Sequence, residues 1–124
     1  MWTRRFAVIS LLTLSSCSHP AQRALQGHWQ GIEVENFNPS ELAVATGWAR
    51  GTSLDFHGSR VTITAPEQST KSASFRLAAI ERRRVTLDIV DAQAVRSELV
   101  LIVDDEDHLR WDLGDGRSLV LVKK

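Results

Sequence analysis

The sequence predicts an all-β protein, an antiparallel meander of about eight strands that closes into a small barrel, with one short helix or wide loop after the first strand. From Gly27 onward, apolar and polar residues mostly alternate, as in strands with one buried and one solvated face. Short turn-forming segments separate these stretches. A chain of 124 residues is expected to hold one domain.

The N-terminal residues resemble a targeting segment and are set apart from the fold. Met1–Arg5 is short and basic, and Phe6–Leu14 is apolar. This apolar stretch is too short to cross a bilayer, which takes roughly 20 residues, and it fits a secretory signal peptide. Because Phe6 follows Arg5 directly, we interpret the arginine pair as an ordinary basic region and not as a twin-arginine export signal.

The segment Leu14-Ser15-Ser16-Cys17 resembles the lipobox of bacterial lipoproteins, an aliphatic residue and two small residues before a cysteine. The resemblance implies that residues 1–16 are a signal peptide and that Cys17 receives the lipid that anchors the chain in the bacterial cell envelope. Ser18 is not acidic, which by the same resemblance favours the outer membrane, facing the periplasm. The alternative is an ordinary secretory signal with an unrelated cysteine. No intrachain disulfide is possible, because the chain has one cysteine.

Residues 17–26 are expected to be the lipid anchor and a tether, and residues 27–124 the barrel domain. As a flexible coil, the tether from Ser18 to Gln26 would span about 17 Å. Pro20 discourages a helix at its start, while Ala21–Leu25 could form a helical turn near the domain.

Alternation and turn residues together define the predicted strands. They are His28–Glu35, Thr52–His57, Arg60–Ala65, Ser72–Ile80, Arg84–Asp91, Ser97–Val103, His108–Leu113 and Ser118–Lys123. Between the first two, Asn38 can cap a helix, Pro39 suits its first position and Glu41 completes a capping-box-like arrangement. We therefore expect a short helix or wide loop from about Ser40 to Ala49.

Each predicted strand from the second onward carries its large apolar residues on one face. These are Leu54, Phe56, Val61, Ile63, Phe75, Leu77, Val85, Leu87, Ile89, Leu99, Leu101, Val103, Leu109, Trp111, Leu113, Leu119 and Leu121. Eight short strands bury such a face by closing into a barrel or by stacking as two sheets. The first strand breaks the alternation, since Trp29 and Gly31 share one side while Ile32 and Val34 share the other. A β-bulge would restore it.

The segment Gly27-His28-Trp29 resembles the Gly-x-Trp signature that opens the first strand of lipocalin-like barrels. The wide first connection and the meander extend the resemblance to Lys124, in the manner of small bacterial lipocalin-like lipoproteins. It implies that Trp29 plugs one end of the barrel and that Arg117 is the candidate for the family's closing arginine. The chain departs from the family in its short domain, in having no helix after the last strand, and in the place of Arg117 before its strand.

The predicted inward face is bulky and almost wholly apolar, with Trp29 and Trp111 both expected to be buried. We therefore expect a filled interior and place any binding surface at the Phe37–Arg50 segment, on Phe37, Trp48 and Arg50, or at the rim loops of the barrel. Aromatic residues and arginine are enriched at interaction hot spots. The alternative is that Trp48 simply covers the core.

No set of residues in the sequence indicates catalysis. The histidines lack the spacing of metal ligands, and no cofactor or metal is expected. Asp104–Asp107 lacks the pattern of a calcium loop, and we interpret Asp112 and Asp115 as turn residues. The run Arg82–Arg84 is expected to be a solvated turn; the alternative is contact with lipid headgroups or an acidic partner. With 15 basic and 15 acidic residues, nucleic acid is not an expected partner.

These observations favour an envelope-tethered lipoprotein that acts as a non-enzymatic binding or accessory module. Its barrel is expected to be monomeric, and its partner an envelope protein or a small apolar molecule. The alternatives are an inhibitor of a periplasmic hydrolase and a carrier of a small apolar ligand.

Overall fold

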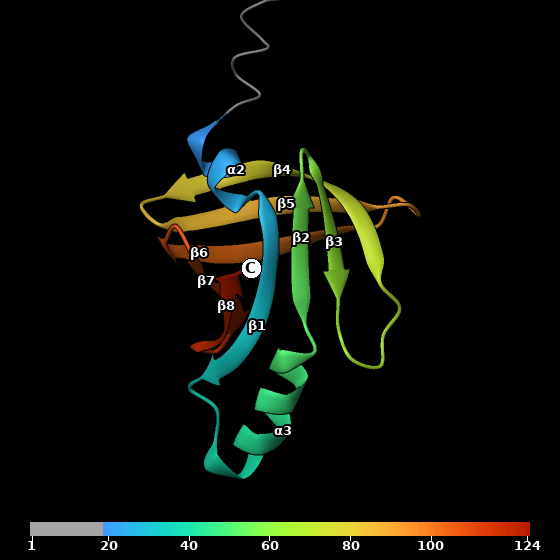
Figure 1. Ribbon diagram of the computed structural model, residues 1–124. Helices are drawn as coiled ribbons and strands as arrows, with labels where there is room; N and C mark the ends of the chain where they lie inside the picture. The colour runs from blue at the N-terminus through green and yellow to red at the C-terminus, as the bar shows by residue number, and fades with distance from the viewer. Residues whose placement is uncertain (1–18) are drawn as a thin grey trace, which may run out of the picture.

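The computed structural model describes residues 19–124, so the predicted signal peptide and the lipid-attachment residue Cys17 lie outside the described residues. Two helices and eight strands make up the described chain (Figure 1). In chain order they are α2 (Pro20–Leu25), β1 (Gly27–Glu35), α3 (Pro39–Arg50), β2 (Ser53–His57), β3 (Arg60–Thr64), β4 (Lys71–Glu81), β5 (Arg84–Asp91), β6 (Arg96–Asp105), β7 (His108–Gly114) and β8 (Arg117–Lys123).

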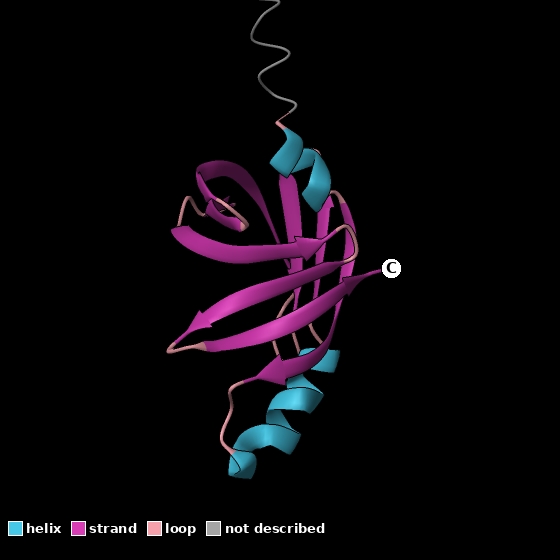
Figure 2. Ribbon diagram, turned by 90° about the vertical axis from the view of Figure 1, so that its left-hand side faces the viewer, coloured by secondary structure: helices cyan, strands magenta, loops and turns pink. Residues whose placement is uncertain are grey.

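The strands form a closed barrel in which each strand pairs with its neighbours in sequence and β1 also pairs with β8. All the pairs are antiparallel, which confirms the predicted meander and excludes the two-sheet sandwich. The helix expected after the first strand is also present, as α3. Figure 2 shows α2 and α3 at opposite ends of the barrel, and we call these the α2 end and the α3 end.

The expected irregularity in the first strand is a β-bulge. The register of β1 against β8 shifts between Gly31 and Glu33, so Ile32 is an extra residue. The shift turns Trp29, Gly31 and Val34 to the same, buried side. The bulge therefore lets one apolar face continue along the whole strand.

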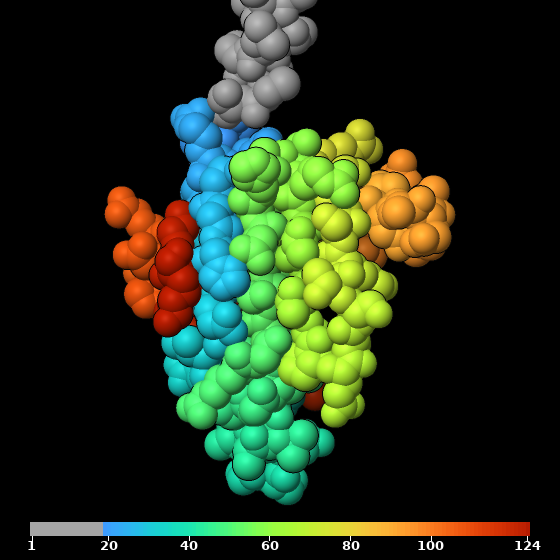
Figure 3. Space-filling model, turned by 45° about the vertical axis from the view of Figure 1, so that its right-hand side comes forward, coloured from blue at the N-terminus to red at the C-terminus, as the bar shows by residue number. Residues whose placement is uncertain are grey.

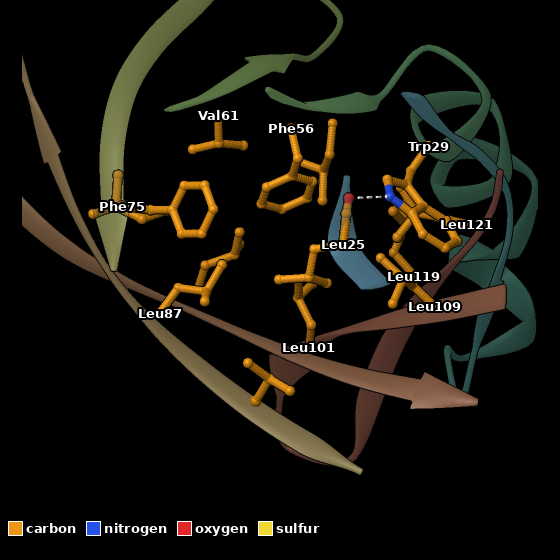
Figure 4. Packing of buried hydrophobic residues seen from close by; sticks show 14 of the residues in the cluster. Leu25, Trp29, Phe56, Val61, Phe75, Leu87, Leu101, Leu109, Leu119 and Leu121 are labelled. Atoms are coloured by element: carbon orange, nitrogen blue, oxygen red, sulfur yellow. Dashed lines mark hydrogen bonds between the residues drawn. The ribbon is translucent and has the colours of Figure 1, made fainter. Parts of the chain in front are cut away.

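Apolar side chains from all eight strands fill the inside of the barrel (Figure 4). Leu54, Leu87 and Leu101 are fully buried there. Phe56 and Phe75 meet edge to face, with ring centroids 5.3 Å apart, a favourable aromatic arrangement. The interior is thus a packed core.

Helix α2 changes the predicted boundary between tether and domain. His19 caps it, since its Nδ1 accepts a hydrogen bond of 3.0 Å from the backbone N–H of Ala21. Leu25, at its end, is fully buried in the core. The helical turn expected at Ala21–Leu25 is therefore present as α2, whereas the expectation of a flexible coil does not hold for Pro20–Leu25, because burial of Leu25 fixes the segment on the barrel.

Trp29 closes the α2 end of the barrel. Its side chain is fully buried, and its indole N–H donates a hydrogen bond of 2.8 Å to the carbonyl of Leu25 (Figure 4). The Nζ atom of Lys123 lies 5.0 Å from the centre of the ring, within the range of a cation–π contact. The cation over Trp29 is thus Lys123 and not Arg117, because Trp29 pairs with Lys123 in the β1–β8 register.

Trp111 is only partly buried, so the expectation that it would be buried like Trp29 is wrong. It packs against the edge of the core from β7. The register of β7 against β8 shifts between Asp112 and Gly114. The inward face therefore loses its regularity just after Trp111, and Leu113 is likewise half-buried.

Candidate functional site

The C-terminal half of α3 is fixed to the barrel. Ala49 is fully buried, and the hydroxyl of Thr52 donates a hydrogen bond of 2.9 Å to the carbonyl of Trp48. Gln30 on β1 donates another, of 2.8 Å, to the carbonyl of Arg50. Gly31 makes this close approach possible, as a Cβ atom there would lie 2.1 Å from the carbonyl oxygen of Ala49.

The N-terminal half of α3 is much more exposed. Asn38 occupies the N-cap position, but its side chain makes no capping hydrogen bond. Leu42 and Val44 leave 45% and 78% of their surface accessible. The helix therefore presents apolar surface to solvent at the end that extends from the barrel.

A hollow of about 520 Å³ lies between α3 and the β7–β8 hairpin, and we call it the α3 hollow. Its walls are mainly apolar, with one cation and one anion among them. The lining residues are Phe37, Ser40, Glu41, Val44, Ala45, Trp48, Leu113 and Arg117.

A second hollow, of about 490 Å³, lies on the other side of α3, against the loop between β3 and β4. Figure 3 shows α3 beside this loop at the end of the molecule. Pro66 and Glu67 of the loop line the second hollow, and Val44 and Trp48 line both hollows. Trp48 is half-buried and packs against the core, so it both covers the barrel and takes part in these two surfaces.

Arg117 has unused hydrogen-bonding capacity beside the α3 hollow. Its guanidinium carbon lies 5.1 Å from the centre of the Phe37 ring. Its Nε atom is buried without a hydrogen-bond partner among residues 19–124. Its Nη2 atom lies 3.9 Å from Oδ2 of Asp115, whose side chain is 90% exposed. A guanidinium has five N–H donors, and a buried donor without an acceptor is unfavourable.

The structure brings together two of the three predicted binding residues. Phe37 and Trp48 both line the α3 hollow, whereas Arg50 is exposed and does not line it. Arg117 supplies the cation there, whereas the lipocalin-like resemblance implied that it lies over Trp29. The contact of Arg117 with Phe37 forms because the β7–β8 turn lies at the α3 end, beside the loop between β1 and α3 that carries Phe37. No local pattern in the sequence indicates this.

The acidic residues that could be candidates for acid–base chemistry are held in structural contacts. Asp112 accepts hydrogen bonds from Arg84, at 2.8 Å, and from the N–H of Gly114, at 2.9 Å. The hydrogen bond from Arg84, followed by that from Gly114, lowers the pKa of Asp112. An ionised carboxylate held in this way caps a turn and is a poor proton donor.

The acidic turn after β6 is also internally paired. The guanidinium of Arg110 donates to both oxygens of Asp104, at 2.8 and 3.0 Å, and the hydrogen bond lowers the pKa of Asp104. His108 contacts Asp105 through Nδ1 at 2.8 Å. Within residues 19–124, no three His, Cys, Asp or Glu side chains gather as a metal site.

Comparison of the chain with family models, curated proteins and solved structures finds no significant match. No helix in the described part of the chain is long and apolar enough to cross a membrane.

Proposed function

We propose that the chain is a lipoprotein tethered to the bacterial cell envelope, and that its barrel is a non-enzymatic binding module with the α3 hollow as its site. The observation that carries the proposal is the pairing of an apolar hollow of about 520 Å³ with an arginine whose buried Nε atom has no hydrogen-bond partner among residues 19–124. This volume falls within the roughly 300–1,000 Å³ of small-molecule sites, which combine apolar walls with a few polar groups.

The lining residues favour an apolar ligand that carries a single anionic or hydrogen-bond-accepting group. Phe37, Trp48 and Leu113 provide the surface for the apolar part. Arg117 provides donors for the accepting group. Glu41 in the same wall disfavours a ligand with several negative charges. Since the interior of the barrel is packed, the ligand would rest at the α3 end.

Tethering is supported by the sequence alone. The lipobox-like Leu14–Cys17 follows a short apolar stretch, the order found in lipoprotein signal peptides. The proposed setting is the outer membrane, with the barrel facing the periplasm.

The binding site can be tested with anilinonaphthalene sulfonate, a fluorescent probe that joins an apolar aromatic part to one anionic group. We expect one probe to bind per protein, and Trp48→Ala and Arg117→Gln to weaken binding. Loss of a hydrogen bond to a charged group costs about 1.5–3 kcal/mol, or about tenfold or more in affinity. Arg50→Gln is the matched control for Arg117→Gln. Arg50 is an arginine on α3, the helix that carries Trp48, but it lies outside the hollow.

Circular dichroism and chemical denaturation of each variant would show that it remains folded, since the probe also binds loosely packed proteins. Equal weakening by Arg50→Gln and Arg117→Gln would contradict the site. A periplasmic hydrolase that copurifies with the wild type, but not with Trp48→Ala, would instead favour the inhibitor hypothesis.

A further inference from the structure

We propose that the anchored barrel rests on the bilayer through its α2 end and holds the α3 end, with its hollow, away from the membrane. The inference depends on the proposed lipid attachment at Cys17. The surface that meets the bilayer, which we call the α2 surface, consists of Pro20, Ala24, Ile80, Arg82 and Arg83.

The first argument is the length of chain between the lipid and the folded domain. Only Ser18 and His19 separate Cys17 from Pro20, the first residue of α2. Even fully extended, this link covers about 10 Å, at up to roughly 3.6 Å per residue. The link is thus shorter than the coil expected from the sequence, and it leaves little room between the headgroups and α2.

The second argument is that α2 cannot swing away from the barrel without breaking contacts. Leu25 is fully buried in the core and accepts the hydrogen bond of Trp29. Gln26 makes two hydrogen bonds with the backbone of Gly58, of 2.9 and 2.6 Å. The lipid therefore fixes the position of the whole barrel, and not only that of a loose segment.

The composition of the α2 surface suits the boundary between headgroups and acyl chains. A shallow hollow of about 270 Å³ lies between α2 and the β4–β5 turn, lined by Pro20, Ala24, Ile80 and Arg83 among others. Ile80 is 42% exposed, and Arg82 in the turn is exposed as well. Arginine side chains can lay their apolar stems along such a surface while the charged groups reach the headgroups.

Charge alone does not set this orientation. The β6–β7 turn, with Asp105 and Asp107, opens at the same end of the barrel as the β4–β5 turn, because hairpin turns in a meander alternate between the two ends. Acidic and basic turns thus face the membrane side together. We infer that the short link decides the orientation, which should be the same over neutral and over anionic lipid.

The α3 end is correspondingly remote from the membrane. Figures 1 and 2 show α3 beyond the far end of the strands from α2. The nine residues of β1 connect the two ends and extend over about 30 Å at 3.3 Å per residue. The exposed Leu42 and Val44 are therefore available to a soluble ligand or partner and do not enter the anchoring bilayer.

The orientation can be measured on the full, lipidated protein in nanodiscs that contain a lipid with a spin label on its headgroup. Ile80→Cys places a thiol on the α2 surface, and Val44→Cys places one on α3, both at exposed positions. Acylation blocks the thiol of Cys17, so each introduced cysteine is the only free thiol and can carry a fluorescent label.

We expect the spin-labelled lipid to remove most of the emission at position 80 and to leave emission at position 44 nearly unchanged, in neutral and anionic nanodiscs alike. Strong quenching at position 44, equal quenching at positions 44 and 80, or an orientation that changes with lipid charge would overturn the proposal. If intact mass shows no lipid and the parent protein reacts with the label, the proposed attachment itself has failed, a result distinct from a lipidated protein in another orientation.

Discussion

Trp29 joins three structural elements at one end of the barrel. It is fully buried, donates to the carbonyl of Leu25 and lies under the Nζ atom of Lys123. One side chain therefore links β1 to helix α2 and to the last strand. Trp111, on β7, is half-buried and makes a smaller contribution to the core.

We expect Trp29→Ala to reduce the free energy of unfolding by about 3–5 kcal/mol, the usual cost of truncating a buried aromatic residue. Trp111→Ala should cost less, because part of its surface is already solvated. Chemical denaturation monitored by far-UV circular dichroism measures both. Trp29→Phe is an informative control, since it keeps most of the volume but leaves the Leu25 carbonyl without its donor. Equal losses for the two alanine variants would contradict the different burial of the two tryptophans.

His108 and Asp105 form a surface pair whose pH dependence can be stated by direction. The hydrogen bond from His108, followed by that from the backbone of Asp107, lowers the pKa of Asp105. The hydrogen bond and charge of Asp105 raise the pKa of His108 above 6.5. A histidine whose pKa is raised by folding stabilises the protein below its unfolded pKa, and this contribution is lost as pH rises through the folded pKa.

We therefore expect the pKa of His108, followed by NMR, to fall toward 6.5 in Asp105→Asn. The slope of stability against pH just above 6.5 should flatten in the same variant, because the largest cause of the difference between the folded and unfolded pKa of His108 is then removed. An unchanged titration of His108 would show that the pair does not form in solution.

At the scale of the elements, the contact between α3 and β1 depends on one glycine. A Cβ atom at Gly31 would lie 2.1 Å from the carbonyl oxygen of Ala49, which is backbone and cannot rotate away. Gly47, in the same helix, would gain a Cβ atom in open space. The two glycines thus offer a matched pair of substitutions with opposite expected effects.

We expect Gly31→Ala to destabilise the protein by about 1–3 kcal/mol, as overpacking does, and to displace α3 from the barrel. Gly47→Ala should stabilise it by up to about 1 kcal/mol, because alanine favours a helix more than glycine does. Thermal denaturation of both variants measures the difference. Destabilisation by Gly47→Ala, or no effect of Gly31→Ala, would contradict the packing of α3 described above.

At the scale of the whole molecule, the anchor decides where the barrel acts. We expect Cys17→Ser to leave the protein as an uncleaved precursor or to release it from the membrane fraction, because serine has no thiol to carry the lipid. Fractionation with detection of the chain, and mass spectrometry of its N-terminus, measure this. A Cys17→Ser protein that is processed normally and stays on the membrane would contradict the lipoprotein assignment.

Part of the candidate site was predictable because it lies in one continuous segment. Phe37 and Trp48 both occur in the stretch that breaks the strand pattern, and both line the α3 hollow. Arg50 is a predicted binding residue because it is close to Trp48 in sequence, but it lies outside the hollow. The remaining wall comes from Leu113 and Arg117, about seventy residues further on, so only the closed barrel could identify them.

The sequence by itself determined the strands, their turns, the bulge in the first strand and the helix after it, because alternation, turn residues and helix capping are local properties of the chain. The tertiary structure decided which side chains meet at each end of the barrel. Pairing of β1 with β8 places Lys123 over Trp29, and burial of Leu25 converts an expected tether into helix α2. Both results depend on contacts between residues that the closed barrel brings together, which a local pattern does not encode.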